Sequence, residues 1–291
     1  MSTRWLVTGA NGQLGHHLAS VLGRAGADAV CLARAELDIS SRGAVEQAIE
    51  RHAPDVVVNA AAYTAVDAAE DDEQRAFAVN ADGPANLAGA LARRAGRLIH
   101  ISTDYVFDGQ AEQPYEPNDA TGPQTAYGRT KFAGEQAARS ALPARCTVVR
   151  TAWVYGGPGP NFVDTMLRLE AERDSVEVVA DQFGSPTWVA DLAGAVVELG
   201  ESQVTHGVLH YVNSGTASWH DLAREAFTLV GADPERVRRT TSDRFVRPAR
   251  RPAWSVISPR AWVAAGLQAP GSWQAALADC VAARSAGQPV G

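Results

Sequence analysis

Tyr127 and Lys131 lie four residues apart in the segment "TAYGRTK", a spacing that could support acid catalysis. Residues i and i+4 are neighbours on one face of a helix, so the phenol and the ammonium can lie side by side. Lys131 is the single lysine among 26 basic residues, the others being arginine. Lysine is a compact point charge, whereas arginine favours planar, bidentate partners. The spacing and the composition together favour a catalytic pair, with an ordinary surface pair as the alternative.

A glycine-rich segment near the N-terminus has the form of a phosphate-binding loop. "TGANGQLG" places Gly9, Gly12 and Gly15 between a predicted strand and a predicted helix. Glycines there permit a tight turn and close approach of the backbone to a pyrophosphate, which the positive helix N-terminus attracts. The spacing G-x-x-G-x-x-G is typical of extended short-chain dehydrogenases. We therefore predict a dinucleotide site, with a glycine turn that binds no ligand as the alternative.

The residues after the second predicted strand bear on the choice of dinucleotide. A site that prefers NAD usually has an acid at this point to bind the ribose 2′-hydroxyl. The sequence instead has Arg34, which can pair with a 2′-phosphate. We therefore predict NADPH, with NADH and a solvated surface arginine as the alternatives. Asp38 and Ile39 are expected at the adenine edge.

Thr103 supplies a hydroxyl at the end of the fourth predicted strand, where open α/β folds bind ligands. Hydride transfer to a carbonyl carbon leaves negative charge on the oxygen, which a positioned acid must neutralise. Tyr127 could donate that proton while Thr103 holds the oxygen. A free tyrosine has a pKa of about 10, and we expect Lys131 and a positive nicotinamide ring to lower it. The three side chains together predict carbonyl reduction.

The first half of the chain alternates predicted strands and helices. Nearly continuous apolar runs predict strands, and helical spacing lies between them. This pattern is typical of an α/β fold with a doubly wound parallel (Rossmann) sheet. The strands are expected at 4–9, 29–33, 55–60, 97–102 and 146–151, and the helices at 12–25, 41–52, 72–95 and 126–140.

The alternation breaks after residue 152, which predicts a smaller C-terminal α/β lobe that binds the substrate. Helices are expected at 161–172, 188–201, 218–230 and 272–285. We place an NAD(P)-binding domain at 1–155 and a substrate lobe at 156–291, with helix 188–201 returning to the first domain.

The overall composition excludes several classes of protein. With 291 residues, 46% of them hydrophobic, the chain can bury a core, and its net charge of −7 argues against binding nucleic acid. Cys31, Cys146 and Cys280 are far apart, so neither a disulfide framework nor a thiolate zinc site is expected. A strand begins almost at the first residue and no apolar run reaches about 20 residues, so we expect neither a signal peptide nor a membrane segment. A cytoplasmic location is predicted.

The order of the motifs resembles the dTDP-4-dehydrorhamnose reductase family, over residues 4 to 282. The matching segments are "TGANGQLG", "NAAAYTAVDAAE", "VNADGPANLA", "STDYVFDG", "YGRTKFAGE", "RTAWVYG", "NFVDTML", "DQFGSPTW" and "RPARRPAWSVIS". The resemblance implies NADPH-dependent reduction of the 4-keto group of a dTDP-4-dehydro-6-deoxy-hexose. The implied substrate is dTDP-4-dehydro-L-rhamnose and the implied product is dTDP-L-rhamnose.

The resemblance also implies roles for individual residues. Tyr127 corresponds to the proton donor, Thr103 to the residue that orients it, and Lys131 to a partner of the cofactor. Besides Tyr127 and Lys131, the implied cofactor contacts are Gly9, Asn11, Gly12, Gln13, Leu14, Gly15, Arg34, Asp38, Ile39, Ala61, Ala62 and Tyr63. The implied substrate contacts are Val66, Thr103, Asp104, Tyr105, Trp153, Asn161, Gln182 and Arg247. For Trp153 a place in the core is the alternative, and for the arginines near 247 a solvated face.

Some family members dimerise through acidic, metal-binding residues on the first helix. His16 and His17 stand in that region, where "HHLAS" has no carboxylate. We therefore predict no metal, and a homodimer, if one forms, without a metal bridge.

Three other functions remain open. A sugar-nucleotide 4,6-dehydratase would have an acid after the Thr-Asp pair, where this chain has Tyr105. A reductase of another dTDP-4-keto sugar, including ring-contracted sugars, would share the same residues. A non-catalytic regulatory subunit, of the kind known for methionine adenosyltransferase, could lose Tyr127 or Lys131, and both are present.

Overall fold

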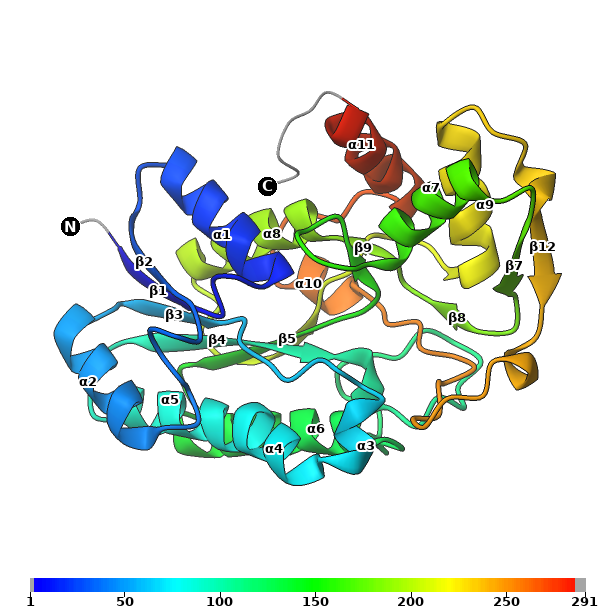
Figure 1. Ribbon diagram of the computed structural model, residues 1–291. Helices are drawn as coiled ribbons and strands as arrows, with labels where there is room; N and C mark the ends of the chain where they lie inside the picture. The colour runs from blue at the N-terminus through cyan, green and yellow to red at the C-terminus, as the bar shows by residue number, and fades with distance from the viewer. Residues whose placement is uncertain (1–2, 286–291) are drawn as a thin grey trace.

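A parallel six-stranded sheet forms the centre of the protein, and the computed structural model describes residues 3–285 (Figure 1). The strand order is β10-β5-β4-β3-β1-β2, and every pairing is parallel. The strands are β1 (Arg4–Thr8), β2 (Asp28–Leu32), β3 (Val56–Asn59), β4 (Arg97–Thr103), β5 (Cys146–Thr151) and β10 (Gly207–His210). The doubly wound α/β fold is confirmed, and β10 is a sixth strand that we did not expect.

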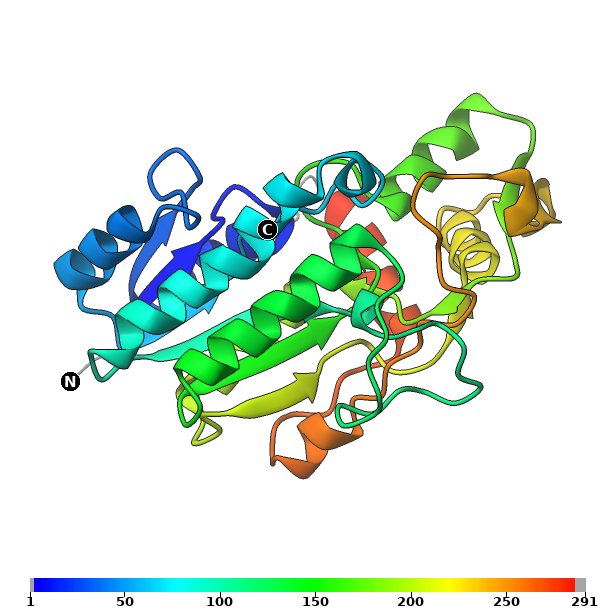
Figure 2. The same cartoon turned by 90° about the horizontal axis from the view of Figure 1, so that it is seen from below.

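The sheet is covered on both faces, because alternate residues of each strand point to opposite sides. Trp5 and Val7 of β1 pack in one apolar cluster, and Leu6 between them packs in the other. Figures 1 and 2 show the helices on the two faces. One face carries α1 (Gln13–Arg24) and α8 (Val189–Glu201), and the other carries α2 (Arg42–His52), α5 (Gly83–Ala92) and α6 (Ala126–Ala141).

The helix expected at 72–95 is interrupted by a π-helical turn. The segments are α4 (Glu73–Phe77), a π turn (Ala78–Asp82) and α5, after the short α3 (Ala68–Asp71). Asn80 is buried in the π turn, where its side chain accepts from the Tyr63 N–H (2.8 Å) and donates to the Tyr63 carbonyl (3.1 Å). It also donates to Thr130 Oγ1 at 3.2 Å. The turn therefore fixes the loop after β3 against α6.

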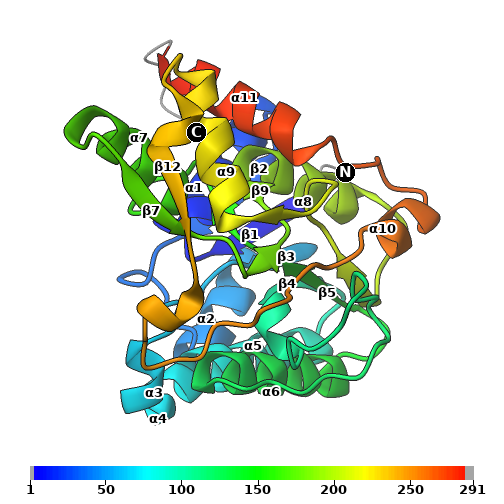
Figure 3. The same ribbon diagram turned by 90° about the vertical axis from the view of Figure 1, so that its right-hand side faces the viewer.

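The second half of the chain builds a smaller region beside the carboxyl ends of the strands (Figure 3). Three short strand pairs support its helices: β7 with β12 and β6 with β9 in parallel, and β8 with β11 antiparallel. Their bounds are β6 (Val154–Tyr155), β7 (Val176–Val179), β8 (Phe183–Gly184), β9 (Thr187–Trp188), β11 (Ala217–Ser218) and β12 (Val237–Thr240). The helices are α7 (Phe162–Glu172), α9 (Trp219–Leu229), α10 (Arg260–Ala264) and α11 (Trp273–Ser285), and 3₁₀ turns lie at 234–236 and 242–244. A further 3₁₀ turn, at 104–106, follows β4 in the first half.

Two elements of the second half belong to the central sheet and the helices that cover it. Strand β10 pairs with β5, and helix α8 packs beside α1 on the sheet. The chain therefore crosses between the two regions more than once. The division at residue 155 stays a prediction. Within residues 3–285, no helix is both long and apolar enough to cross a membrane.

Candidate functional site

Tyr127 lies in the first turn of α6, close to the carboxyl end of β4. The helix begins at Ala126 because Thr125 caps it: its Oγ1 accepts a hydrogen bond from the Gly128 N–H at 3.1 Å. The Ala126 N–H donates to Glu70 Oε1 at 2.8 Å, which fixes the same turn to α3. The backbone that carries Tyr127 is therefore held from two sides.

Lys131 lies one turn further along α6 and is buried. Its ammonium donates to the carbonyl oxygen of Ile101 in β4 at 2.6 Å. Burial lowers the pKa of Lys131 to about 8, and the charge of Glu135 opposes that shift. The single ammonium is thus partly desolvated and anchored to the backbone of the central sheet.

The pKa of Tyr127 differs from our expectation. Burial raises the pKa of this phenol to about 12, a hydrogen bond with the Thr103 side chain opposes the shift, and the charge of Asp104 adds to it. Lys131 is not among the groups that shift the pKa of Tyr127, and its ammonium donates to the Ile101 carbonyl instead. The phenol therefore keeps its proton near neutral pH, which suits a proton donor.

Thr103, Asp104 and Tyr105 follow one another where β4 ends. Thr103 Oγ1 donates to Asp104 Oδ1 at 2.9 Å, and the Tyr105 N–H donates to Thr103 Oγ1 at 3.2 Å. Burial raises the pKa of Asp104 to about 6, while the Ser255 and Thr103 side chains oppose the shift. The Tyr105 ring meets the Tyr127 ring edge to face, with 5.5 Å between centroids. Tyr105 thus contacts the predicted proton donor, while Thr103 and Asp104 lie near enough to shift its pKa.

A cavity of about 200 Å³ opens at the carboxyl ends of β1, β2 and β3. It is lined by Gly9, Asn11, Gly12, Arg34, Leu37, Asp38, Ile39, Ala60, Ala61, Ala62, Tyr63 and Val79. Nine of these twelve residues were predicted as cofactor contacts from the sequence, and they come from three separate loops. The structure therefore brings the predicted segments together around one cavity.

The glycine loop has the shape that a pyrophosphate requires. Gly9 has φ +74°, and a Cβ there would lie 2.7 Å from the Ala61 nitrogen. A Cβ on Gly15 would overlap the carbonyl oxygen of Gly9, so the first turn of α1 can approach the loop this closely with glycine alone. Gly12 at the N-cap supplies no side-chain acceptor, which leaves the first N–H groups of α1 open to an anion. These residues fit the diphosphate of a dinucleotide.

Three predicted cofactor contacts follow in the first turn of α1 and do not line this cavity. Leu14 and Gly15 are buried between the helix and the sheet. Gln13 Oε1 is buried and has no hydrogen-bond partner among the described residues. A Cβ on Gly157 would press on the Gln13 side chain, which places Gln13 against the loop after β6.

Arg34 is exposed at the cavity, and the acids around it have other partners. Glu36 accepts a hydrogen bond from the Ala33 N–H at 2.9 Å. Asp38 Oδ1 accepts from the hydroxyl and the N–H of Ser40, and these two bonds lower the pKa of Asp38. The guanidinium of Arg34 is therefore available to a ligand.

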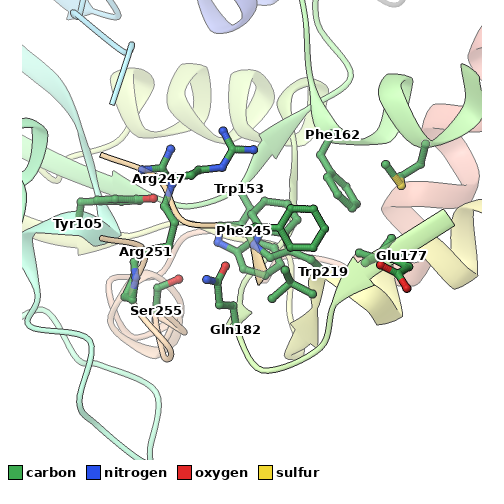
Figure 4. A pocket seen from close by; sticks show the side chains of 14 residues that line it. Tyr105, Trp153, Phe162, Glu177, Gln182, Trp219, Phe245, Arg247, Arg251 and Ser255 are labelled. Atoms are coloured by element: carbon green, nitrogen blue, oxygen red, sulfur yellow. The ribbon is translucent and has the colours of Figure 1, made fainter. Parts of the chain in front are cut away.

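A second cavity, of about 360 Å³, lies between β4 and the smaller region (Figure 4). Four predicted substrate contacts line it: Tyr105, Trp153, Gln182 and Arg247. The other lining residues were not predicted from the sequence; they are Phe162, Met166, Glu177, Val178, Val179, Trp219, Phe245, Arg251, Pro252 and Ser255. The aromatic rings and the arginines suit a ligand with a flat base and negative charge.

Trp153 forms part of the wall of this cavity in a strained conformation. Its φ is +47°, a value that is costly for a bulky side chain and that clusters at functional sites. The ring stacks on Trp219 with 3.5 Å between centroids and 5° between planes. Gly184 lies against the other side, since a Cβ there would overlap the indole. The strained backbone therefore holds the ring pair at the cavity rather than in the core.

The remaining predicted substrate contacts lie outside both cavities. Thr103 and Asp104 are buried at the end of β4, and Val66 lies in the turn before α3. Asn161 caps α7 by accepting from the Asp164 N–H at 3.0 Å. Its Nδ2 is buried without a partner among the described residues.

An ion pair that the sequence analysis missed joins the two regions. Arg251 donates from two nitrogens to the two carboxylate oxygens of Asp67, at 2.9 and 2.8 Å. The Ala249 N–H also donates to Asp67, at 3.2 Å, and Arg247 lies 3.5 Å from it. Asp67 follows β3, whereas the arginines belong to the segment that borders the second cavity, so this contact sets the position of that segment.

No group of three His, Cys, Asp or Glu side chains is placed to hold a metal ion within residues 3–285. His17 is buried and hydrogen-bonds to the Gln13 carbonyl at 3.1 Å, while His16 is exposed. The three cysteines are free thiols, two of them buried. A homodimer without a metal bridge stays a prediction.

Comparison with known proteins places the chain in a family. The model of the RmlD substrate binding domain matches residues 3–285. A dTDP-4-dehydrorhamnose reductase of Streptomyces griseus is 49% identical over 293 residues, covering 99% of this chain and 96% of the relative. A probable dTDP-4,6-dihydroxy-2-methyloxan-3-one 4-ketoreductase of Streptomyces antibioticus is also 49% identical, over 278 residues, covering 95% and 94%.

A solved structure shares the whole architecture. The crystal structure of a dTDP-4-dehydrorhamnose reductase from Bacillus anthracis, in complex with NADP, has a TM-score of 0.93 and 35% identity. The match covers 97% of this chain and 99% of that one. Because the family model, the S. griseus relative and this crystal structure each match nearly the whole chain, the protein, with its parallel sheet, glycine loop and Tyr-Lys pair, belongs to the dTDP-4-dehydrorhamnose reductase (RmlD) family of the extended short-chain dehydrogenase superfamily.

Proposed function

We propose that this protein reduces the 4-keto group of a dTDP-4-dehydro-6-deoxy-hexose with NADPH, and that its substrate is dTDP-4-dehydro-L-rhamnose. The activity is that of the S. griseus relative at 49% identity, and the dinucleotide is of the kind bound by the B. anthracis protein. NADH is the alternative reductant.

The position of Tyr127 carries this proposal. Its ring packs against Tyr105, which lines the larger cavity, and it shares an apolar cluster with Tyr63, which lines the smaller one. A group between a dinucleotide cavity and a sugar-nucleotide cavity lies where hydride and proton must both reach one carbonyl. The single buried lysine lies one turn away on the same helix.

Each of the three central residues has a separate task. Tyr127 holds its proton near neutral pH and gives it to the carbonyl oxygen as negative charge develops there. The Thr103 hydroxyl opposes the rise in the pKa of Tyr127 and keeps the phenol oriented. Lys131 supplies positive charge on the same helix face and binds the ribose of the dinucleotide. The bound NADPH supplies the hydride.

The remaining predicted contacts divide between the two ligands. The glycine loop and the first turn of α1 bind the pyrophosphate, and Arg34 binds the 2′-phosphate, with Asp38 and Ile39 at the adenine edge. Tyr105, the Trp153–Trp219 stack and Gln182 bind the sugar nucleotide, and Arg247 binds its diphosphate. Val66 and Asn161, which lie outside both cavities, act on the ligands through the loops that they hold.

A coupled assay tests the proposal. The purified protein should oxidise NADPH when dTDP-4-dehydro-L-rhamnose is generated by the upstream enzymes, and NMR should identify the product as dTDP-L-rhamnose. If no dTDP-4-keto-hexose supports NADPH oxidation, the protein is not a reductase of this class.

A second dTDP-linked sugar is a candidate substrate. The S. antibioticus relative is as similar as the S. griseus relative, and its name describes a 4-ketoreductase of a different dTDP-linked sugar. A panel of dTDP-4-keto sugars, compared by kcat/KM with product stereochemistry assigned by NMR, decides between the two. A higher kcat/KM for another sugar than for the rhamnose precursor would reassign the substrate and retain the chemistry.

Two further points of the proposal have simple tests. A non-catalytic regulatory subunit would bind NADPH without oxidising it in the same assay. Sedimentation analysis with and without a chelator tests for a homodimer that needs no metal bridge.

A further inference from the structure

Three polar side chains form a row across the central sheet, on the face that α5 and α6 cover. Thr8 of β1, Asn59 of β3 and His100 of β4 are paired with one another in the sheet, and all three are fully buried. Thr8 Oγ1 donates to Asn59 Oδ1 at 2.7 Å, and Asn59 Nδ2 lies 3.1 Å from His100 Nδ1. The row ends at His100, because the residue opposite it on β5 is Val148.

The hydrogen bonds of Asn59 assign the proton of the His100 ring to one nitrogen. Asn59 Oδ1 also accepts from the Ala61 N–H, at 3.2 Å, and a backbone N–H can only donate. The other end of the amide, Nδ2, is therefore the donor, and Nδ1 of His100 is the acceptor. Burial lowers the pKa of His100 well below its usual value, and the charge of Lys131 lowers it further. The ring is thus neutral, with its proton on Nε2.

Nε2 of His100 is buried and has no hydrogen-bond partner within residues 3–285. Ser102 lies two residues later on the same face of β4, and its hydroxyl is also buried without a partner in this part of the chain. The Ile101 carbonyl, between these residues, accepts from the Lys131 ammonium at 2.6 Å. Helix α6, which carries Lys131, lies along this face of the sheet (Figure 3). Two unpartnered side chains therefore flank the carbonyl that holds the ammonium.

These groups cannot satisfy one another directly. The Nε2–H of His100 and the ammonium of Lys131 are both donors, so neither accepts from the other. The Ser102 hydroxyl is bonded to neither of them. A water molecule suits all three groups, because its oxygen accepts from both donors and one of its protons is donated to Ser102 Oγ. Buried waters typically make about three such bonds to polar groups that have no other partner.

We propose that a buried water joins His100 Nε2, Ser102 Oγ and the Lys131 ammonium, and that His100 is a positioning residue for this lysine. The ammonium has three N–H groups. One donates to the Ile101 carbonyl, the water accepts from the second, and the third is left for the ribose of the dinucleotide. The effect of His100 on NADPH rests on the function proposed above, whereas the water site rests on the hydrogen bonds alone.

The same network reaches the dinucleotide cavity. Asn59 links the His100 ring to the N–H of Ala61, which lines that cavity. An ammonium that is held in place before the ligand arrives loses less freedom on binding, which strengthens the complex. Loss of the bridge at His100 should therefore weaken the binding of NADPH.

Nuclear magnetic resonance of the isotope-labelled full chain, without ligands, tests the protonation of the ring. His100 should have a pyrrole-type Nε2 and a pyridine-type Nδ1 from about pH 6 to 9, and its Nε2 proton should show a cross-peak with water. The spectrum of His100→Asn identifies the signals. A ring that carries its proton on Nδ1, or that becomes charged in this range, would overturn the proposal.

A high-resolution crystal structure tests the water itself and needs no activity. One ordered water should lie within hydrogen-bond distance of His100 Nε2, Ser102 Oγ and Lys131 Nζ. Clear density for these side chains with no water between them would exclude the site. Direct contact of Ser102 Oγ with either nitrogen would exclude it equally.

Two substitutions of His100 separate positioning from support of the fold. The amide of glutamine can place an N–H donor near the position of Nε2, whereas asparagine reaches only the position of Nδ1 and keeps the contact with Asn59. His100→Asn should weaken NADPH binding about fivefold and lower kcat by a similar factor. His100→Gln should stay within about twofold of the wild type. Fluorescence titration measures binding, and steady-state kinetics measures kcat.

His210→Asn is the matched control, because His210 is a second fully buried histidine, on the edge strand β10. It should leave NADPH binding within about twofold of the wild type, and circular dichroism checks that every variant is folded. Equal weakening by the two His100 substitutions, or by His210→Asn, would reduce His100 to a structural role and refute positioning. If no dTDP-4-keto sugar is reduced, the proposed function fails, while the spectra and the crystal structure still decide the water site.

Discussion

Arg251 donates two parallel hydrogen bonds to the carboxylate of Asp67, which lies 184 residues earlier in the sequence. The pair connects the loop after β3 to the segment that lines the second cavity, of about 360 Å³. Both side chains are largely shielded from water, with exposed fractions of 23% and 31%. Because bidentate contacts between arginine and carboxylate fix geometry as well as charge, we expect this pair to control how the segment meets the sugar nucleotide.

Asp67→Asn should raise the KM for the dTDP-sugar about tenfold, while kcat and the KM for NADPH change less than about threefold. The amide cannot accept two charged hydrogen bonds, so the segment that carries Arg247 and Arg251 loses its anchor. Steady-state kinetics with each substrate varied in turn measures the effect. Glu73→Gln is the matched control, because Glu73 holds Arg129 in the same bidentate geometry at an exposed site. Equal effects of the two substitutions would exclude a special role for Asp67.

Tyr127→Phe should lower kcat by about a hundredfold or more, the range of lost general acid catalysis. NADPH should bind this variant almost as tightly as the wild type, since the ring and its contact with Tyr105 remain. Single-turnover oxidation of NADPH measures the chemical step, and fluorescence titration measures binding. Tyr155→Phe is the control, because the Tyr155 hydroxyl is buried without a described partner in the smaller region. A Tyr127→Phe enzyme with more than about a tenth of the wild-type kcat would show that another group donates the proton.

The dependence of kcat/KM on pH should reflect the protonation of Lys131. Its pKa of about 8 means that the ammonium is charged below pH 8 and neutral above it, whereas Tyr127, with a pKa of about 12, stays protonated throughout. If the charge on Lys131 is required, kcat/KM should fall as pH rises through about 8, because that ratio reflects groups of the free enzyme.

Lys131→Arg provides the control for this profile, since arginine stays charged over the whole range. The variant should be slower, because the guanidinium does not fit the contact with the Ile101 carbonyl, and its kcat/KM should be flat between about pH 7 and 9. A decline near pH 8 that persists in this variant would assign the titration to a different group.

Arg34→Ala should raise the KM for NADPH about tenfold and leave the KM for NADH nearly unchanged, because NADH has no 2′-phosphate. Arg34 is exposed at the dinucleotide cavity, and the acids after β2 are hydrogen-bonded to Ala33 and Ser40. Arg51→Ala, at an exposed arginine near the end of α2, controls for the loss of surface charge. If both KM values rise equally, Arg34 does not meet the 2′-phosphate.

The sequence predicts the sheet and the glycine loop well because their signals are local. Apolar runs such as 55–60 and the glycines at 9, 12 and 15 specify strand and turn within a few residues. Strand β10 escaped prediction because only two of its residues, Val208 and Leu209, are apolar, and its place at the edge depends on pairing with β5. The π turn was likewise missed, because its helical spacing continues into both neighbours and Asn80 is bonded to residues far away in sequence.

The site was predicted in part for the same reason. Residues in contiguous motifs, such as Tyr127 and Lys131, could be recognised together. Trp219 lies 66 residues from Trp153, and no local sequence pattern predicts that their rings stack. The Asp67–Arg251 pair also depends on tertiary structure. The rise in the pKa of Tyr127 could not be anticipated from the Tyr-Lys pair alone, because it results from desolvation by the fold.

The burial of the single lysine has a practical chemical consequence. Amine-selective acylating reagents find one side chain to modify in this protein, and that ammonium is shielded and bonded to β4. The rate of acylation at Lys131, read by mass spectrometry, therefore measures how often this part of the molecule opens. Ligands that reduce this opening should slow acylation of Lys131. The acylation rate therefore reports whether a ligand is bound, and the native chain needs no added label.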